Sequence, residues 1–361
     1  MTSQPNKFLL HGIDTLQCAY FLIRNHVEES IDFAWLAHQK EIIQQSKSKS
    51  PAAVTLAGVE FLLLPHGSSS GYPYILENGD FKIELGEFNS PNFYVTFRSQ
   101  ALWRESAWLL HAKFIKWAAK AGFAPYREES LSRVDFSFDY LLPHIDFDEN
   151  SFVSRSTKDS QYRENGSVQT FSFGKGDIVL RVYDKIAEIQ QQSSKVWFYL
   201  LWHQDQNVWR FEWQLRKKAL RKFDIQTFEH LKNQQGDILY YLVTEHDTLR
   251  IPTTDKNRSR WPLHPIWQDL QGQIENLNNL GVHRIIGQPS ALEERMQRIS
   301  ISLYGYLKRV AAITCIQEGR SMTDHTTALN SIIPMLNKLY EPMAWEADVE
   351  KRIKEMQLGQ W

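Results

Sequence analysis

The chain has 361 residues, of which 42% are apolar and 23% are charged. These fractions match soluble globular proteins and exclude a disordered or fibrous chain, and the length predicts about two structural units. The formal net charge is −1, so no overall basic field indicates a nucleic-acid partner, and such a partner has to be argued from local clusters. The 12 Trp, 14 Tyr and 20 Phe are available for cores and for stacking on unpaired bases.

The spacing of the cysteines and the hydropathy of the sequence indicate the cellular compartment in which the chain folds. Cys18 and Cys315 lie far apart and show neither the CxxC nor the Cys/His spacing of a zinc site or a disulfide framework. Residues 1–7 are polar, and no apolar run approaches the roughly 18 residues that a membrane span needs. We therefore expect a reduced, cytoplasmic protein with neither a signal peptide nor a membrane segment.

The first part of the chain is strand-rich and ends in a helix. Residues 8–23 form a mixed apolar run interrupted by Asp14, compatible with a strand that leads into a helix. Helical spacing follows, and then come apolar and alternating segments typical of strands. The predicted elements are a helix over 28–45, strands over 59–65, 80–86 and 92–98, and a helix over 101–121.

A second series of predicted strands followed by a helix begins near residue 132. It predicts strands over 133–140, 169–173, 177–183 and 209–216, with a hairpin turn at 174–176, and a helix over 217–241. The sequence FYVTFRSQAL at 93–102 loosely echoes VWRFEWQLRKKAL at 208–220, which hints at internal duplication. We predict an α+β catalytic domain over residues 8–250, a large mostly antiparallel sheet with helices on its apolar face, whose two similar halves would span 8–125 and 130–250.

The composition and the hydrophobic pattern of the sequence change after residue 250. A polar linker precedes a Trp- and Pro-rich segment at 261–267, and the remainder is mostly helical in pattern. We place a domain boundary near residue 250. Residues 251–361 are expected to serve DNA recognition, dimerisation or contact with a partner.

The polar sides of three predicted strands in the second part share an unusual composition. Because strand side chains alternate between faces, each strand puts its charged residues on one side, which we expect to be the solvent side. Such a face is often polar simply because it is wet, and cross-strand ion pairs would explain neighbouring Arg and Asp. Here carboxylates and arginines surround one tyrosine. The residues are Arg133, Asp135, Ser137 and Asp139; Arg181, Tyr183 and Lys185; and Arg210, Glu212, Gln214 and Arg216.

This mixture fits phosphodiester chemistry. Carboxylate oxygens suit Mg²⁺ or Mn²⁺, and arginine matches phosphate oxygens in a bidentate fork. Tyr183 supplies a nucleophile that can hold a cut DNA end covalently. The pKa of its phenol, ordinarily about 10, would have to be lowered by the metal, Arg181 or Lys185. From the pentapeptide 181–185 alone, an idle tyrosine on a strand is the more ordinary interpretation.

A basic stretch follows the last of these strands. Helical spacing could align its cations into a stripe that tracks a DNA backbone, although a solvated helix face is an equally ordinary interpretation. The candidate DNA-binding residues are Arg133, Arg210, Arg216, Lys217, Lys218 and Arg221.

The order of these motifs resembles the plasmid replication initiation factor family, the rolling-circle initiators of small plasmids with relatives in filamentous phages and integrative elements. The resemblance is carried by Arg133-Val134-Asp135-Phe136 with Asp139, by 170–174 leading into 180–185 with Glu188, and by 209–215. The segment 261–267 is also similar to a Trp- and Pro-containing segment of those proteins. The resemblance covers roughly residues 10–270.

The resemblance implies a site-specific endonuclease that nicks and rejoins single-stranded DNA at a replication origin, with topoisomerase-like strand transfer. Tyr183 would form a 5′-phosphotyrosine and release a 3′-hydroxyl primer. The implied site consists of Tyr183, Arg181 and Lys185 as catalytic residues, Asp135, Asp139 and Glu212 nearest the Mg²⁺ or Mn²⁺, and Arg181 and Arg210 on phosphates. The expected partners are single-stranded or cruciform origin DNA, a host helicase and a second copy of the chain, with no membrane.

Two alternatives stay open at this point. The protein could be a non-catalytic DNA-binding protein of a mobile element, such as a repressor or an architectural factor. It could also be a hydrolytic metal nuclease in which water attacks and Tyr183 only positions the phosphate. Cleavage of an end-labelled single strand separates these alternatives, according to whether no cut, free ends or a protein-bound end results.

Overall fold

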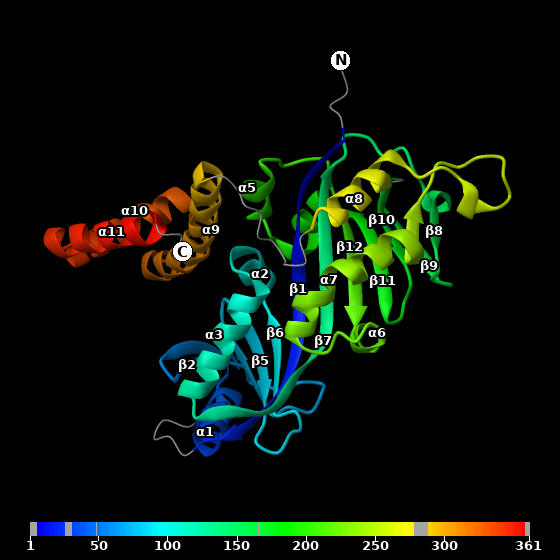
Figure 1. Cartoon of the computed structure of the whole chain (residues 1–361). Helices are drawn as coiled ribbons and strands as arrows, with labels where there is room; N and C mark the ends of the chain where they lie inside the picture. The colour runs from blue at the N-terminus through cyan, green and yellow to red at the C-terminus, as the bar shows by residue number, and fades with distance from the viewer. Residues whose placement is uncertain (1–5, 26–30, 48, 165–166, 278–287, 358–361) are drawn as a thin grey trace. The chain divides into compact units, whose positions relative to one another are not determined.

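The structure is a computed structural model that describes residues 6–25, 31–47, 49–164, 167–277 and 288–357. The chain divides into two compact units, Met1–Ile286 and Gly287–Trp361. All the strands of the described chain belong to the first unit, and the second consists of helices (Figure 1).

An eleven-stranded sheet forms the centre of the first unit, and its strands pair antiparallel in the order β2-β3-β4-β5-β6-β1-β7-β12-β11-β10-β9. The strands are β1 (Lys7–Arg24), β2 (Ala52–Leu56), β3 (Val59–Leu63), β4 (Tyr74–Glu77), β5 (Phe81–Leu85), β6 (Phe93–Phe97), β7 (Phe123–Leu141), β9 (Asp159–Glu164), β10 (Ser167–Phe173), β11 (Ile178–Asp184) and β12 (Val208–Arg216). A separate two-stranded sheet pairs β8 (Phe152–Ser154) with β13 (Asp247–Leu249). The predicted hairpin of β10 and β11 is confirmed.

The two longest strands, β1 and β7, lie side by side at the middle of the sheet (Figure 1). Outward from β1 the order is β6, β5, β4, β3, and outward from β7 it is β12, β11, β10, β9. Because β1 and β7 are antiparallel, this matching order relates the halves by an approximate twofold rotation about an axis normal to the sheet. Such a rotation keeps the polar faces of both halves on the same side, and it is the arrangement that internal duplication produces.

Helices cover the apolar face of this sheet. In the first half α3 packs Trp117 against Phe93 of β6, and in the second half α8 packs Trp267 against Trp213 of β12. The helices of the first unit are α1 (Phe33–Gln45), α2 (Ser99–Arg104), α3 (Ala107–Lys120), α4 (Lys185–Glu188), α5 (Phe198–Trp202), α6 (Lys217–Lys222), α7 (Phe228–Tyr241) and α8 (Pro265–Glu275). Short 3-10 or π turns are η1 (Glu149–Ser151), η2 (Ile189–Ser193), η3 (Leu242–His246) and η4 (Arg258–Arg260). The predicted α+β class, with a large antiparallel sheet, helices and a helical C-terminal region, is confirmed.

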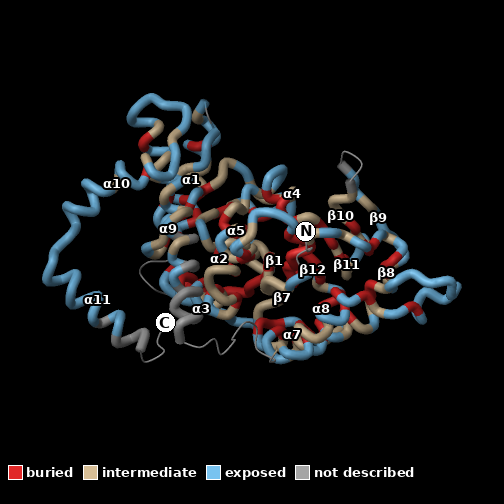
Figure 2. Tube along the Cα trace, turned by 90° about the horizontal axis from the view of Figure 1, so that it is seen from above, coloured by how far each residue is buried: buried red, intermediate tan, exposed pale blue. Residues whose placement is uncertain are grey.

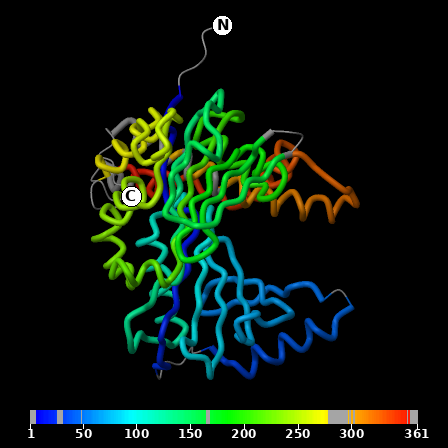
Figure 3. Tube along the Cα trace, turned by 90° about the vertical axis from the view of Figure 1, so that its right-hand side faces the viewer, coloured from blue at the N-terminus to red at the C-terminus, as the bar shows by residue number. Residues whose placement is uncertain are grey.

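Views from two further directions locate the core. Seen from the side, α7 and α8 lie on one side of the strands of the second half (Figure 3). Buried residues gather along β7, β12 and β11 (Figure 2). The largest fully buried side chains include Trp213 and Trp267, but also the charged residues Arg210 and Lys185. A charged residue in that group is unusual, because burying a charge is costly without a partner.

Two predicted helices are each divided in two. Within 101–121, α2 ends before Ser106, whose side chain caps the start of α3 by accepting a backbone N–H. Within 217–241, α6 and α7 are separated at Asp224, which adopts a left-handed φ of 56°, and Thr227 caps the start of α7. The apolar periodicity continues across both breaks, so it does not reveal them.

The domain boundary predicted near residue 250 lies inside the first unit, which extends to Ile286. The segment after residue 250 contributes η4 and α8 to that unit, and Trp267 of α8 is 0% exposed. The second unit holds α9 (Gln288–Glu318), α10 (His325–Leu339) and α11 (Pro342–Gln357). Within it, the hydroxyls of Thr314 and Ser331 hydrogen-bond at 3.0 Å and join α9 to α10. Across the described ranges, no helix is long and apolar enough to cross a membrane.

Candidate active site

Cross-strand register arranges the polar residues of β7, β12 and β11 in rows. Arg210 of β12 lies opposite Asp139 of β7 and Tyr183 of β11. The next row consists of Ser137, Glu212 and Arg181. Since residues two apart on a strand face the same way, both rows lie on one face of the sheet, as the alternation predicts.

The segment between β11 and β12, residues 185–207, covers this face, and we call it the cap. It comprises α4, the π-helix η2 and α5. The guanidinium of Arg210 lies over the ring of Phe198 at 4.5 Å, and Trp202 Nε1 donates to Asp139 Oδ2 at 2.9 Å. Asp139 and Arg210 are both 0% exposed, so the prediction that these residues lie on the solvent side is wrong. The aromatic side chains of the cap exclude water from a face that the strand pattern alone marks as wet.

Arg210 lies between two carboxylates under the cap. Its Nε and Nη2 donate to Asp139 Oδ1 and Oδ2 at 2.6 and 2.8 Å, and its Nη1 donates to Asp14 Oδ1 at 2.9 Å. Burial by itself would lower the pKa of Arg210, but Asp139 and Asp14 hold that pKa well above its usual range. All three nitrogen atoms of the Arg210 guanidinium thus donate to carboxylates. In this arrangement Arg210 does not point toward a phosphate site, in contrast to the role expected from the sequence.

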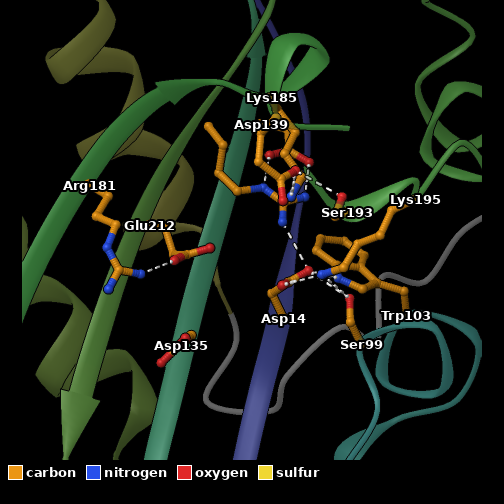
Figure 4. A network of polar contacts seen from close by, with 12 residues as sticks. Asp14, Ser99, Trp103, Asp135, Asp139, Arg181, Lys185, Ser193, Lys195 and Glu212 are labelled. Carbon is orange, nitrogen blue, oxygen red and sulfur yellow. Dashed lines mark hydrogen bonds and ion pairs between the residues drawn. The ribbon is translucent and has the colours of Figure 1, made fainter. Parts of the chain in front are cut away.

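Asp14 is the main site residue that sequence reasoning missed. Beyond Arg210 it accepts hydrogen bonds from Ser99 Oγ and Trp103 Nε1, both at 2.9 Å, and from Lys195 Nζ at 3.0 Å (Figure 4). These contacts tie β1 and α2 of the first half to the cap of the second. Burial alone would raise the pKa of Asp14, but the surrounding cations, Arg210 foremost, hold it well below its usual range.

In the sequence, Asp14 is a single charge inside an apolar run. The prediction that this run is a strand leading into a helix is wrong, because β1 is one strand of 18 residues, and only this longer strand shows where Asp14 lies in the sheet. The register of β1 against β7 shifts between Ile13 and Thr15, so Asp14 sits at an irregularity of the ladder. Strict alternation cannot place a residue at such a position on a face.

Tyr183 is held by one carboxylate. Its hydroxyl donates to Glu212 Oε2 at 3.0 Å, and Arg181 Nη1 donates to the other oxygen, Glu212 Oε1, at 3.1 Å. Tyr183 is only 9% exposed. Burial first and the Glu212 charge second raise the pKa of the phenol well above its usual value, while Arg210 opposes them. The phenol therefore rests in its neutral form, in contrast to the lowered pKa that the nucleophile was expected to need.

Lys185 does not extend the strand. β11 ends at Asp184, whose side chain accepts from the backbone N–H groups of residues 186 and 187 and caps α4. Lys185 is the first residue of that helix, is 1% exposed, and pairs with Glu188 at 2.6 Å. Its Nζ lies 5.4 Å from the centre of the Tyr183 ring. Burial and the nearby Arg210 lower the pKa of Lys185.

Asp135 is 2% exposed and is bound by Arg133 of the same strand. Arg133 Nε and Nη2 donate to its two oxygens, at 2.9 Å to Oδ1 and 2.5 Å to Oδ2. Burial raises the pKa of Asp135 to about 6, with Arg133 opposing and the Glu212 charge adding to the rise. Asp135 and Glu212 are thus close enough to repel each other, although each has its own guanidinium.

The three predicted metal ligands do not fit a divalent cation in this arrangement. Asp135 is bound by Arg133, Asp139 by Arg210, and Glu212 by Arg181 and the Tyr183 hydroxyl. Within the described part of the chain, no group of three or more His, Cys, Asp and Glu side chains is arranged to hold a metal ion. A cation could reach these oxygens only by displacing guanidinium groups.

An open groove adjoins the polar rows where β12 ends. It has a volume of about 500 Å³ and is lined by Gln17, Ser132, Arg133, Asp177, Arg216, Lys217 and Lys218. Arg216 lies directly opposite Arg133 across the two strands, and Asp135 offsets the charge of Arg133 in this pairing of like charges. Burial lowers the pKa of Lys217, and the nearby Arg221 lowers it further. Of the predicted basic residues, Arg133, Arg216, Lys217 and Lys218 thus line one groove, which also contains Asp177, paired with Lys218 at 3.8 Å.

Comparison with known proteins leaves the function to be argued from the site. No family model matches the chain, and no curated protein matches it. A solved structure of a rolling circle replication initiator protein from Geobacillus stearothermophilus is similar, with 20% sequence identity and a TM-score of 0.45, over 77% of this chain and 100% of that chain. A likeness at this level carries no argument about activity.

Proposed function

We propose that the protein is a rolling-circle replication initiator that nicks and rejoins single-stranded DNA through Tyr183. The observation that carries the proposal is the hydrogen bond from the Tyr183 hydroxyl to Glu212, at 3.0 Å, on a face shared with Arg181. The hydrogen bond places the phenol beside a buried carboxylate that can take its proton. The order of motifs along the chain, which resembles the plasmid replication initiation factor family, supports the same reaction.

In the proposed reaction the Tyr183 oxygen attacks a backbone phosphorus atom. The bond from phosphorus to the 3′ oxygen breaks, the protein keeps the 5′ phosphate, and the free 3′ hydroxyl serves as primer. Splitting one transesterification into two reversible steps through a covalent intermediate lets the same site rejoin the strand. Arg181, of which 35% of the side chain is exposed, is the guanidinium of this row that a phosphate can approach.

The basic groove supplies the proposed DNA contact. Lys217, Lys218 and Arg216 would follow the backbone of a single-stranded or cruciform origin, because paired cations release counterions from phosphates. The second unit is the proposed site of dimerisation or of contact with a host helicase. Binding of DNA is proposed to move the cap, because Tyr183 is only 9% exposed in this arrangement.

The decisive experiment uses a pool of random-sequence single-stranded oligonucleotides labelled at the 3′ end. Incubated with Mn²⁺, the wild-type protein should become labelled, because the fragment that carries the 5′ phosphate stays on Tyr183. Tyr183→Phe should abolish the adduct and leave DNA binding nearly intact. An adduct formed by the Phe variant would refute the assignment of the nucleophile.

The same assay bears on the two alternatives. Binding without cleavage would indicate a repressor or architectural protein, and cleavage with free ends would indicate a hydrolytic nuclease. A requirement for Mg²⁺ or Mn²⁺ stays a prediction, because the carboxylates as arranged do not fit the ion. Titration of Mn²⁺ against adduct formation, with Asp135→Asn beside the wild type, measures whether Asp135 contributes to any such dependence.

A further inference from the structure

We propose that Glu212 is the general base of the nicking step, taking the proton of the Tyr183 hydroxyl, rather than a metal ligand. This inference rests on the proposed function and assigns to Glu212 a role in it. The distance of 3.0 Å from the hydroxyl oxygen to Glu212 Oε2 is within the range for direct proton transfer. Both residues are at least nine-tenths buried in this arrangement.

The surroundings of Glu212 orient one oxygen toward the nucleophile. Arg181 Nη1 holds Oε1 at 3.1 Å, which leaves Oε2 for Tyr183. Arg181 is fixed in turn, because its Nη2 donates to Gln214 Oε1 at 2.7 Å. Arg181 therefore acts as a positioning residue that sets the direction of the carboxylate.

The neighbouring carboxylates are engaged elsewhere. Asp139 accepts from Arg210 and Trp202, and Asp135 accepts from Arg133. The charged groups around Tyr183 and Glu212 are Asp14 of β1, Arg133 and Asp135 of β7, Arg181 of β11, Lys185 and Glu188 of α4, and Arg210 of β12. Among the carboxylates of the described residues, Glu212 is the one that accepts the Tyr183 proton in a hydrogen bond.

A base is needed because an attacking phenol has to lose its proton, and the Tyr183 hydroxyl holds that proton in the hydrogen bond to Glu212. Proton transfer has to accompany formation of the new bond. The Tyr183 oxygen bonds to phosphorus as its proton passes to Glu212 Oε2, the bond from phosphorus to the 3′ oxygen breaks, and the departing oxygen takes a proton from solvent water. In the rejoining step an incoming 3′ hydroxyl gives up a proton to solvent, and Glu212 returns its proton to the leaving tyrosine.

The test measures the single-turnover rate of adduct formation on the 3′-labelled oligonucleotide pool. Glu212→Gln removes the proton acceptor and should slow the reaction by about 10²- to 10⁴-fold, the usual contribution of general base catalysis. Glu84→Gln is the matched control, since Glu84 is also a buried carboxylate on the polar face but lies in the first half. It should leave the rate unchanged.

Two outcomes distinguish failure of this inference from failure of the proposed function. A Gln variant with the wild-type rate, while Tyr183→Phe is inactive, would overturn the role of Glu212 alone. An adduct on the Phe variant would overturn the nicking function itself. If circular dichroism shows that Glu212→Gln does not fold, Glu212→Asp replaces it in the test. Its shorter carboxylate should still support the reaction at a reduced rate, and a full wild-type rate would overturn the proposal.

Discussion

The two halves of the sheet share a strand order but differ in what lies over their polar faces. In the first half, β5 and β6 are joined by the short connection 86–92, and Tyr94 and Glu84 face each other as a cross-strand pair. In the second half, the corresponding connection between β11 and β12 is the 23-residue cap, residues 185–207. Arg210 and Asp139 beneath it are wholly buried.

This difference shows that the cap, rather than the strands, creates the candidate site. Both halves present polar residues on the same side, so polarity of a strand face does not identify chemistry. Removing water strengthens each charge interaction and makes each unpaired charge costly. The variants considered next test this contrast between a covered and an open polar face.

The largest effect on stability should come from the covered face. Asp139→Ala leaves Arg210 buried with part of its counter-charge missing, which should cost about 3–5 kcal/mol in the free energy of unfolding. The matched change in the first half is Glu77→Ala, which breaks a partly exposed pair with Arg98 at 2.8 Å. That change should cost at most about 1 kcal/mol. Urea unfolding measures both, and equal losses would contradict the contrast.

The pH dependence of stability should have opposite signs in the two halves. The folded state raises the pKa of Asp135 from 3.8 to about 6, so it binds the proton more tightly than the unfolded chain does. The stability that this group contributes is present below pH 4 and is lost as pH rises through about 6, an amount on the order of 3 kcal/mol. Asp135→Asn should remove this fall, which urea unfolding at pH 4 and pH 7 would detect.

Asp80 of the first half provides the reversed case. Although burial would raise its pKa, Lys113 and Arg104 hold that pKa below the usual value. Its contribution is present above the unfolded pKa and is lost as pH falls through the lower folded value. Asp80→Asn should therefore destabilise the protein at pH 7 and have less effect at low pH. A pair of variants with the same sign of pH dependence would refute the assignment of charges.

A smaller effect is expected in the groove. Lys217→Ala should weaken binding of oligo-dT and reduce the slope of log affinity against log salt by about 0.7, the value for one cation on a single strand. Lys116→Ala is the control, because Lys116 is exposed on α3, which covers the opposite face. Fluorescence anisotropy at several salt concentrations measures the slopes. Equal slopes for Lys217→Ala and the wild type would exclude Lys217 from the DNA contact.

The smallest effect should follow from loosening the cap. Lys195→Ala removes the bond to Asp14, but 25% of the Lys195 side chain is exposed and Asp14 keeps Arg210. The loss of stability should be about 1 kcal/mol or less. Amide hydrogen exchange in α5 should nonetheless become faster, because this bond joins the cap to β1. Unchanged exchange would show that the aromatic contacts alone hold the cap.

The strands and their shared face could be predicted because alternation is a local property of the sequence. The cap could not, because Phe198 and Trp202 occur in an irregular connection whose position over the sheet depends on tertiary packing. The same limit applies to Asp14, whose role needs a partner about 200 residues away on β12. The hydrogen bond of Tyr183 to Glu212 follows from strand register, which the sequence specifies only through the pairing of whole strands.

The central position of β1 has a consequence for the growing chain. β1 precedes the other strands of the sheet along the chain, yet Lys7 pairs with Leu141 of β7, while Leu16 pairs with Phe97 on its other side. The first half can therefore assemble on the ribosome while one long edge of β1 stays unpaired. Such an edge readily pairs with other chains. Rapid synthesis of residues 98–141 would shorten that exposure, so translation speed in this stretch should influence how much of the protein aggregates before the sheet is complete.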